Sequence, residues 1–204
     1  EECDMLKLQI TRDGAYDDEY LELPATPADV GEVWCRLDET STDVASTRIC
    51  GTISDIWNIG NYLKRADVND PIQLKKLNRI GELTRGLSRD ECLLFQGGLD
   101  SESINGLDDV IDVGEHLDRY LLVRHVTSDR ELGICLVTNG IKPFDESVQP
   151  YLDYSKIGIE YYANHGGTYT SGGYVLRRDS AEQTLRDIVD ARNNRQAFGT
   201  MRME

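Results

Sequence analysis

The sequence has no uninterrupted run of about 18 apolar residues, so it predicts no membrane-spanning helix. No signal-peptide pattern is visible in its first residues. Cysteine is sparse and never occurs as C-x-x-C. The five cysteines are Cys3, Cys35, Cys50, Cys92 and Cys135. An odd number of widely spaced cysteines predicts free, mostly buried thiols in a reducing cytosol, and we therefore expect a cytoplasmic protein.

Positive charge is also scarce. The 204 residues include 37 Asp and Glu against 22 Lys and Arg, which gives a formal net charge of −15. A chain this acidic is repelled by nucleic acid and by anionic membranes, so we expect it to bind neither directly. Its natural partners are basic surfaces, and many basic surfaces exist to hold nucleic acid. The hydrophobic fraction of 39 % is enough for a folded core.

Residues 100–118 contain no Lys or Arg at all. Their seven carboxylates are Asp100, Glu102, Asp108, Asp109, Asp112, Glu115 and Asp118. Apolar residues recur at helical spacing at 107, 110, 111, 114 and 117, which predicts a helix with one buried and one acidic face. If the whole stretch were helical, its charges would lie about 4 Å apart. Charges along a DNA strand lie about 3.4 Å apart, so the stretch predicts a surface that resembles a DNA backbone.

An ordinary solvent-exposed helix face is the alternative interpretation. Such faces usually mix acids and bases, because opposite charges four residues apart stabilise a helix and like charges destabilise it. The lack of bases therefore costs stability, which favours a functional role. A second acidic segment lies in a predicted turn and the strand after it. Its carboxylates are Asp13, Asp17, Asp18, Glu19 and Glu22.

Hydrophobic periodicity predicts a mixed α+β chain. The predicted strands span residues 5–10, 20–23, 48–53, 120–126, 132–137, 159–163 and 174–177. The last two are expected to form a hairpin around the glycine pairs at 166–167 and 172–173. The predicted helices begin at Pro27 or span residues 55–64, 74–87, 89–96, the acidic stretch, 145–156 and 181–198.

Capping signals predict where some of these helices begin and end. Ser88 and Ser180 each open a capping box, with an acid or amide side chain three residues later. The pair Gly97-Gly98 is expected to end the helix that follows Ser88, and Gly199 is expected to end the last helix.

The order of elements predicts four segments. Residues 1–70 form a mixed β/α domain, 71–127 a helical domain with an acidic face, 128–178 a second mixed β/α domain, and 179–204 a helical tail. The boundary near residue 70 rests on the sequence DVNDP, because a residue before proline resists the helical conformation.

Several segments resemble the ArdA antirestriction family. The strongest similarity lies in residues 151–158 (YLDYSKIG), 166–170 (GGTYT) and 172–175 (GGYV). Residues 77–83 (LNRIGEL) and 95–99 (FQGGL) resemble the middle domain of that family, and the opening strand, turn and helix resemble its first domain. Two features depart from the family pattern: Ile159-Glu160 stands where the family usually has Arg-Asp, and the residues after Asp179 are additional.

The resemblance implies an elongated, three-domain, acidic protein that forms a homodimer. Members of the family are DNA mimics that occupy the DNA-binding groove of type I restriction-modification enzymes, and mobile genetic elements carry them. The family has no catalytic residues to transfer. The resemblance thus gives a reason for unpaired carboxylates on an ordered helix, and it implies that the partner is the DNA-binding subunits of such an enzyme.

The sequence offers little support for catalysis or metal binding. A calcium loop starting at Asp100 would need acids where Ile104 and Ile111 stand and glycine where Asn105 stands. His116, His125 and His165 have no zinc-ligand spacing. Loose divalent binding and a Cys–His pair formed by the fold are left open. We predict no catalytic residue, no cofactor and no metal site, and we do not expect an enzyme.

Six of the ten tyrosines gather in the last third of the chain, at 151, 154, 161, 162, 169 and 174. They are interpreted as a small core with its rim, and a dimer or partner interface is the alternative. For the whole chain we expect an ArdA-like DNA mimic. The alternatives are an acidic regulatory module of a mobile element that binds another basic DNA-processing protein, and an unrecognised enzyme.

Overall fold

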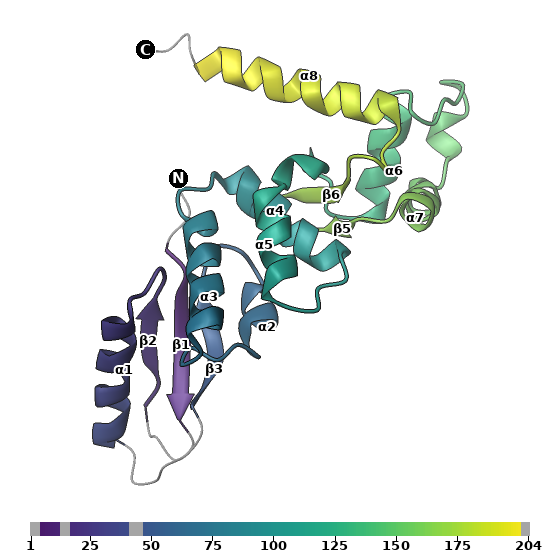
Figure 1. The fold of residues 1–204 in the computed structure, drawn as a ribbon. Coiled ribbons are helices and arrows are strands. Elements are labelled where there is room, and N and C mark those ends of the chain that lie inside the picture. Colours follow the sequence, from purple (N-terminus) through teal and green to yellow (C-terminus); the bar gives the residue numbers. More distant parts are fainter. Residues whose placement is uncertain (1–4, 13–16, 41–46, 201–204) are drawn as a thin grey trace. The chain divides into compact units, whose positions relative to one another are not determined.

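The chain is a mixed α+β protein, as predicted. The computed structural model describes residues 5–12, 17–40 and 47–200, and the side chains of these residues except 38–40 and 193–200. The fold divides into two compact units, Glu1–His116 and Leu117–Glu204, which are called unit 1 and unit 2 below. Each unit has a three-stranded antiparallel sheet with helices packed on it (Figure 1).

The sheet of unit 1 has the strand order β2-β1-β3 and confirms the three strands predicted there. Its strands are β1 (Lys7–Arg12), β2 (Glu19–Glu22) and β3 (Thr47–Ile53). Leu8 and Ile10 are buried while Lys7 and Gln9 are half-buried, so the alternation of side chains sets which face meets the core. Helix α1 (Pro27–Thr40) packs beside β2, and the short α2 (Ile59–Leu63) packs against β3.

Three further helices complete unit 1: α3 (Pro71–Thr84), α4 (Arg89–Ser101) and α5 (Leu107–Glu115). Asp70 caps α3, and the predicted capping box of Ser88 and Glu91 opens α4. The prediction that Gly97-Gly98 ends α4 is wrong, because the helix continues to Ser101. Both glycines are buried, and packing there outweighs their helix-propensity cost of about 1 kcal/mol each.

The predicted boundaries do not coincide with the division into units, so the three-domain arrangement is not confirmed. No division falls at residue 70, because the Asn78 side chain accepts from the backbone nitrogen of Ala25 at 2.8 Å and donates to its carbonyl at 2.7 Å. The predicted boundary near residue 127 differs from the observed division at 116/117, because β4 (Tyr120–Arg124) pairs with β6 (Gly173–Arg177) in unit 2.

The sheet of unit 2 has the order β4-β6-β5, where β5 is Thr168–Tyr169. Three α-helices, α6 (Asp129–Thr138), α7 (Tyr154–His165) and α8 (Gln183–Thr200), accompany the short 3₁₀ helices Leu117–Arg119 and Gln149–Tyr151. The core of unit 2 joins one face of the sheet to these helices. Its members include Leu121, Val123, Leu132, Leu136, Tyr161, Tyr174, Leu176 and Leu185.

Three predictions in unit 2 are wrong. Residues 132–137, predicted as a strand, lie in α6, and residues 159–163, predicted as one arm of a hairpin, lie in α7. The predicted helix 145–156 is replaced by the 3₁₀ helix and the start of α7. A short apolar run cannot distinguish a buried strand from a buried helix. The observed hairpin joins β5 to β6.

Close packing of α6 on α7 explains the glycines there. A Cβ atom on Gly133 would collide with the backbone of Tyr154, and one on Gly158 would collide with the backbone of Asp129. The last helix differs from its prediction only at its ends, because α8 begins at Gln183 and continues to Thr200, past Gly199.

The cysteines depart from the expectation of free thiols. Cys92, in α4, is disulfide-bonded, whereas Cys35, Cys50 and Cys135 are free. Cys35 is exposed, and the other two are half-buried. Sequence spacing cannot show which cysteines a fold brings together. Among the described residues, no helix is both long and apolar enough to cross a bilayer.

Candidate acidic interface

Helix α5 is a short amphipathic helix held against α3 and α4. Its Val110 and Val113 are buried, and Gly114 lies so close to Phe95 that a Cβ atom would come within 2.8 Å of the ring. Asp108, Asp112 and Glu115 are exposed, as the sequence predicted. The predicted apolar face did not include Val113, because it was defined by the spacing of residues 107, 110, 111 and 114.

The seven carboxylates of residues 100–118 do not lie on one helix, so the spacing calculated for a fully helical stretch does not apply, whereas the helical pattern from Leu107 onward corresponds to α5. Asp100 lies in the last turn of α4, and Glu102 caps its carboxyl end. Asp118 belongs to the 3₁₀ helix of unit 2. Gly106, with fully extended backbone, starts a new helix. The remaining four, Asp108, Asp109, Asp112 and Glu115, lie on α5.

Helix α5 keeps the charge density of a nucleic-acid strand. Nine helical residues span about 13.5 Å at a rise of about 1.5 Å each. Four carboxylates over that length give one charge per roughly 3.4 Å, the spacing of charges along one DNA strand. The predicted spacing of negative charges, similar to that of a DNA strand, therefore applies to α5 and not to the whole stretch.

Helix α3 supplies two bases to this face. Lys76 Nζ lies 2.6 Å from Asp108 Oδ2, and Arg79 lies 2.8 Å from Glu115 Oε1 and 3.1 Å from Glu82 Oε2. The hydrogen bonds that Arg79 donates, first to Glu115 and then to Glu82, raise the pKa of Arg79. The sequence stretch showed no base because these bases come from more than 30 residues earlier. Exposed pairs of this kind contribute about 0–1 kcal/mol.

Three further carboxylates of the stretch lie beside a backbone nitrogen, a histidine ring or a tyrosine hydroxyl, whereas Asp118 interacts with Arg178. Asp109 accepts a hydrogen bond from the backbone nitrogen of Asn105 at 2.7 Å. Asp112 lies 3.1 Å from Nδ1 of His116. Asp100 Oδ1 lies 3.1 Å from the hydroxyl of Tyr62, and burial together with the Asp100 charge raises the pKa of Tyr62 to about 12. A neutral donor leaves a carboxylate with its full charge.

The second acidic segment lies on β2 and the residues just before it, and Asp13 lies outside the described residues. Asp17 is exposed, and Asp18 accepts from Gln9 Nε2 at 2.7 Å. Glu19 pairs with Arg36 at 2.7 Å, and Glu22 pairs with Lys7 at 3.3 Å. The predicted acidic turn is therefore partly neutralised by α1 and β1.

A hollow of about 270 Å³ between β2 and α1 brings further carboxylates near this segment. Glu22, Asp29 and Glu32 line it together with Arg36 and Tyr20. Asp29 lies in the first turn of α1, and the hydrogen bond from the backbone nitrogen of Thr26 lowers its pKa.

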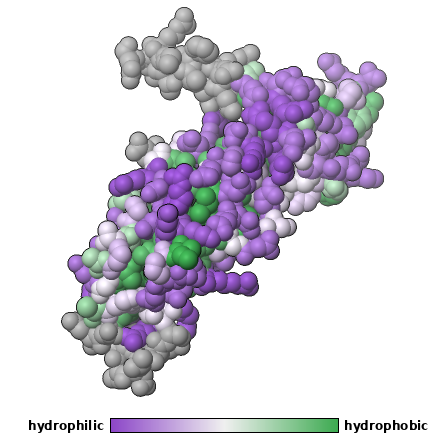
Figure 2. All heavy atoms as spheres, in the orientation of Figure 1, coloured by the Kyte–Doolittle hydropathy of each residue, from purple (hydrophilic) through white to green (hydrophobic). Residues whose placement is uncertain are grey.

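The division at 116/117 separates the charge of the protein. Unit 1 contains 25 acidic and 11 basic residues, a net of −14, whereas unit 2 contains 12 and 11, a net of −1. Figure 2 shows hydrophilic side chains over most of the face that it draws, with smaller hydrophobic areas between them. The net charge of the chain is therefore a property of unit 1.

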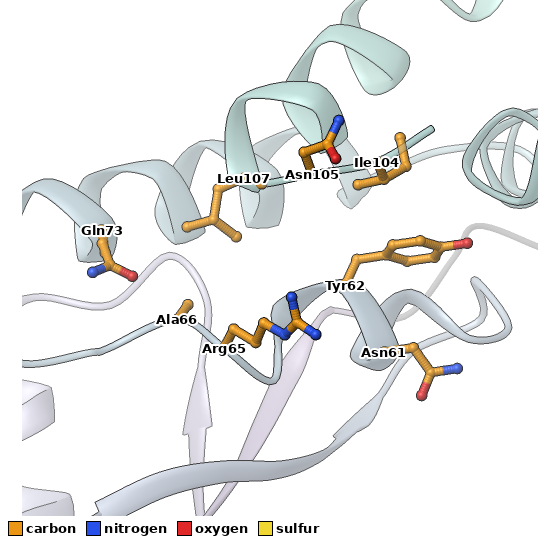
Figure 3. A pocket seen from close by; sticks show the side chains of 9 residues that line it. Asn61, Tyr62, Arg65, Ala66, Gln73, Ile104, Asn105 and Leu107 are labelled. Carbon is orange, nitrogen blue, oxygen red and sulfur yellow. The ribbon is translucent and has the colours of Figure 1, made fainter. Parts of the chain in front are cut away.

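A second hollow in unit 1 lies between α2 and the connection from α4 to α5, with a volume of about 450 Å³ (Figure 3). Tyr62 and Arg65 line one side, and Ile104, Asn105 and Leu107 line the other. No carboxylate, thiol or histidine lines this hollow.

The histidines have structural neighbours. His116 Nδ1 lies 2.8 Å from the carbonyl oxygen of Asp112, and His165 Nδ1 lies 2.7 Å from that of Ser180. His125 adopts a left-handed backbone conformation. Within the residues that the structure describes, no group of three or more His, Cys, Asp or Glu side chains could hold a metal ion.

The tyrosine cluster divides between core and surface. Tyr161 and Tyr174 are fully buried, and Tyr169 is half-buried and donates to Asp129 Oδ1 at 2.8 Å. Burial raises the pKa of all three. Tyr151 and Tyr162, in contrast, are 87 % and 42 % exposed. The core interpretation holds for the buried tyrosines, and an interface interpretation remains available for the two exposed ones.

Comparison with known proteins adds no assignment: no family model matches the chain, and no curated protein matches it. The resemblance to the ArdA family thus rests on the segments quoted above. The charge and geometry of unit 1 therefore indicate the function.

Proposed function

We propose that this protein is an ArdA-like antirestriction protein that acts as an acidic DNA mimic. In this proposal it occupies the DNA-binding groove of a type I restriction-modification enzyme in the cytoplasm of a cell that receives a mobile genetic element. The observation that carries the proposal is the concentration of charge: unit 1 has a net charge of −14 and unit 2 of −1. The protein itself has no catalytic role and binds no nucleic acid.

The proposed mechanism is displacement of counterions from a basic groove. The carboxylates of α5, spaced like phosphates, take the place of one DNA strand along that helix. Because phosphate contacts carry most of the sequence-independent affinity for DNA, the mimic needs no equivalent of the bases. The exposed carboxylates before and on β2 extend the acidic surface, and a homodimer would present two copies of it.

The decisive experiment is binding of the purified protein to a type I methyltransferase core, in competition with a DNA duplex, across a salt series. We expect competitive binding whose affinity falls at least about 1,000-fold between 50 and 200 mM salt, as for a ligand that makes six or more phosphate-like contacts. Absence of competition at 50 mM salt, or an affinity independent of salt, would contradict the proposal.

A second candidate function follows from the two bases of α3. Because Lys76 and Arg79 pair with Asp108 and Glu115, half of the carboxylates on α5 already have a cationic neighbour. A surface with mixed charges suits a basic protein other than a DNA groove. The alternative is therefore an acidic regulatory module of a mobile element that binds another DNA-processing protein. Capture of such a protein from host lysate, without restriction-modification subunits, distinguishes it.

A further inference from the structure

Trp57 is an unusually exposed aromatic residue. It lies in the connection between β3 and α2, and 68 % of its surface is exposed. The neighbouring Ile56 and Ile59 are only 2 % and 0 % exposed. Tryptophan is highly buried on average in folded proteins. The side chains of Ile56 and Ile59 thus lie in the core, whereas the indole of Trp57 lies on the surface.

Local hydrogen bonds hold this connection in place. The backbone nitrogen of Ile56 donates to Ser54 Oγ at 3.2 Å, and that of Ile59 donates to the carbonyl of Ile56 at 3.3 Å. Asn58 has a φ of 66°, a left-handed conformation that few residues other than glycine adopt. Asparagine adopts this conformation more readily than most residues, so it is no sign of strain, and the hydrogen bonds of Ile56 and Ile59 fix the backbone on both sides of Trp57.

The same connection leads directly to the acidic site. Helix α2 packs against α5, and its Tyr62 lies 3.1 Å from the carboxylate of Asp100. Tyr62 follows Trp57 by five positions, in the helix that begins at Ile59. Trp57 therefore lies just before a helix that contacts the acidic stretch.

We propose that Trp57 is the aromatic anchor of the surface through which unit 1 binds its basic protein partner, and that its indole face receives an arginine or lysine side chain of that partner. The inference rests on the proposed function, because it takes the partner to be basic. The net charge of −14 on unit 1 draws cationic side chains to this surface. Tryptophan is the best cation–π acceptor, and it is enriched among the residues that dominate binding energy.

The chain offers a matched control, because it has only two tryptophans. Trp34 is half-buried, and its Nε1 donates to Asn69 Oδ1 at 2.7 Å. In Trp34→Phe, the emission of Trp57 is the only indole signal. In Trp57→Phe, the emission of Trp34 is the only indole signal. A nona-arginine peptide serves as the cationic probe, and a nona-glutamate peptide serves as the negative control.

We expect nona-arginine to quench and shift the emission of Trp34→Phe and to leave that of Trp57→Phe unchanged. In calorimetric titrations of the full chain, Trp57→Ala should raise the Kd for nona-arginine by about 5- to 20-fold, and Trp57→Phe by a smaller factor. The slope of log Kd against log salt should stay the same, because the variants remove no charge. Trp34→Phe should bind as the unchanged protein does.

Three results would overturn the inference. The first is equal Kd values for the unchanged protein and Trp57→Ala. The second is weaker binding by Trp57→Ala together with unchanged binding by Trp57→Phe and by a protein with fluorinated indole. That result would indicate an apolar contact. The third is an emission shift that follows protein concentration rather than peptide, which would indicate a second copy on Trp57. The proposed function fails separately, by absence of competition with duplex at the methyltransferase core.

Discussion

Units 1 and 2 are built alike and charged differently. Each has a three-stranded antiparallel sheet, and helices pack against both sheets. Unit 1 nevertheless carries a net charge of −14 and unit 2 of −1. A small α+β unit can thus fold with balanced charge, as unit 2 does. Since self-repulsion destabilises a compact acidic domain, the excess on unit 1 needs a reason beyond folding, and a basic partner supplies one.

Packing also differs between the units. In unit 2 the backbones of α6 and α7 meet at Gly133 and Gly158, where no Cβ atom fits. In unit 1, Gly31 on α1 has nothing within 4 Å of its potential Cβ atom. Close approaches at glycine occur in unit 1 as well, at Gly81 and Gly114, but there the nearest atom belongs to a side chain, whereas at Gly133 and Gly158 it belongs to the backbone.

The largest expected effect concerns this packing. Gly158→Ala should lower the free energy of unfolding by about 3 kcal/mol, because the new methyl group would collide with the backbone of Asp129 and the helices would have to separate. Gly31→Ala should instead raise it by about 0.5–1 kcal/mol through helix propensity. Denaturant unfolding followed by circular dichroism measures both. Equal effects of the two substitutions would show that the close approach of α6 and α7 is not a constraint.

The second expected effect concerns charge. Simultaneous reversal of Asp108, Asp112 and Glu115 to lysine should weaken binding to the methyltransferase core on the order of 100-fold at low salt, because three phosphate-like contacts are lost. The measurement is competition with duplex at 50 mM salt, with circular dichroism as a check of folding. In this variant Lys76 loses Asp108, and Arg79 loses Glu115 but keeps Glu82, at a small cost in stability, because exposed pairs contribute about 0–1 kcal/mol.

A matched triple reversal in unit 2 sharpens that test. Asp145, Glu146 and Glu160 are exposed and can be changed to lysine with the same change in total charge. We expect binding to weaken by less than about 3-fold, because the proposal assigns the contact to α5 and these three residues belong to unit 2. If both triple variants lose affinity equally, the total charge of the chain controls binding, and α5 is not the contact surface.

The comparison also explains how much could be predicted from the sequence. In unit 1 the alternation in residues 5–10 and the capping box at Ser88 are local signals, and both were confirmed. In unit 2 the short apolar run at 132–137 was predicted as a strand, and it is helical because it packs in α6 with Gly133 against the backbone of Tyr154. Local patterns fix elements with distinct periodicity, and tertiary packing decides the ambiguous ones.

The candidate site shows the same limit. The exposure of Asp108, Asp112 and Glu115 followed from helical spacing. Their pairing with Lys76 and Arg79 did not, because sequence separations of more than 30 residues leave no local signal. The exposure of Trp57 was also not predicted, because no pattern in the sequence assigned a role to this residue.

The smallest expected effect is a difference in the acid response of the two units. Asp190 of unit 2 accepts two hydrogen bonds from Arg178, at 2.9 and 3.0 Å, which lower its pKa below the ordinary value of 3.8. Asp70 of unit 1 caps α3, and the backbone hydrogen bond from Ile72 lowers its pKa. A lowered folded-state pKa stabilises the fold above the unfolded value of about 3.9, and that stabilisation is lost as pH falls through the folded-state pKa.

Asparagine cannot lose or gain this proton, so the free energy of unfolding of Asp190→Asn and of Asp70→Asn should fall less steeply below about pH 3.9 than that of the unchanged protein. The two replacements should differ in their response to salt. The contribution of Asp190 depends on a cation, so 1 M salt should reduce the effect of Asp190→Asn through screening. The contribution of Asp70 depends mainly on a backbone hydrogen bond, and asparagine is also a good capping residue, so Asp70→Asn should have a smaller effect that salt hardly changes. Thermal unfolding between pH 2.5 and 6 at 0.05 and 1 M salt measures both, and an equal response of the two variants to salt would contradict the assignment of these causes.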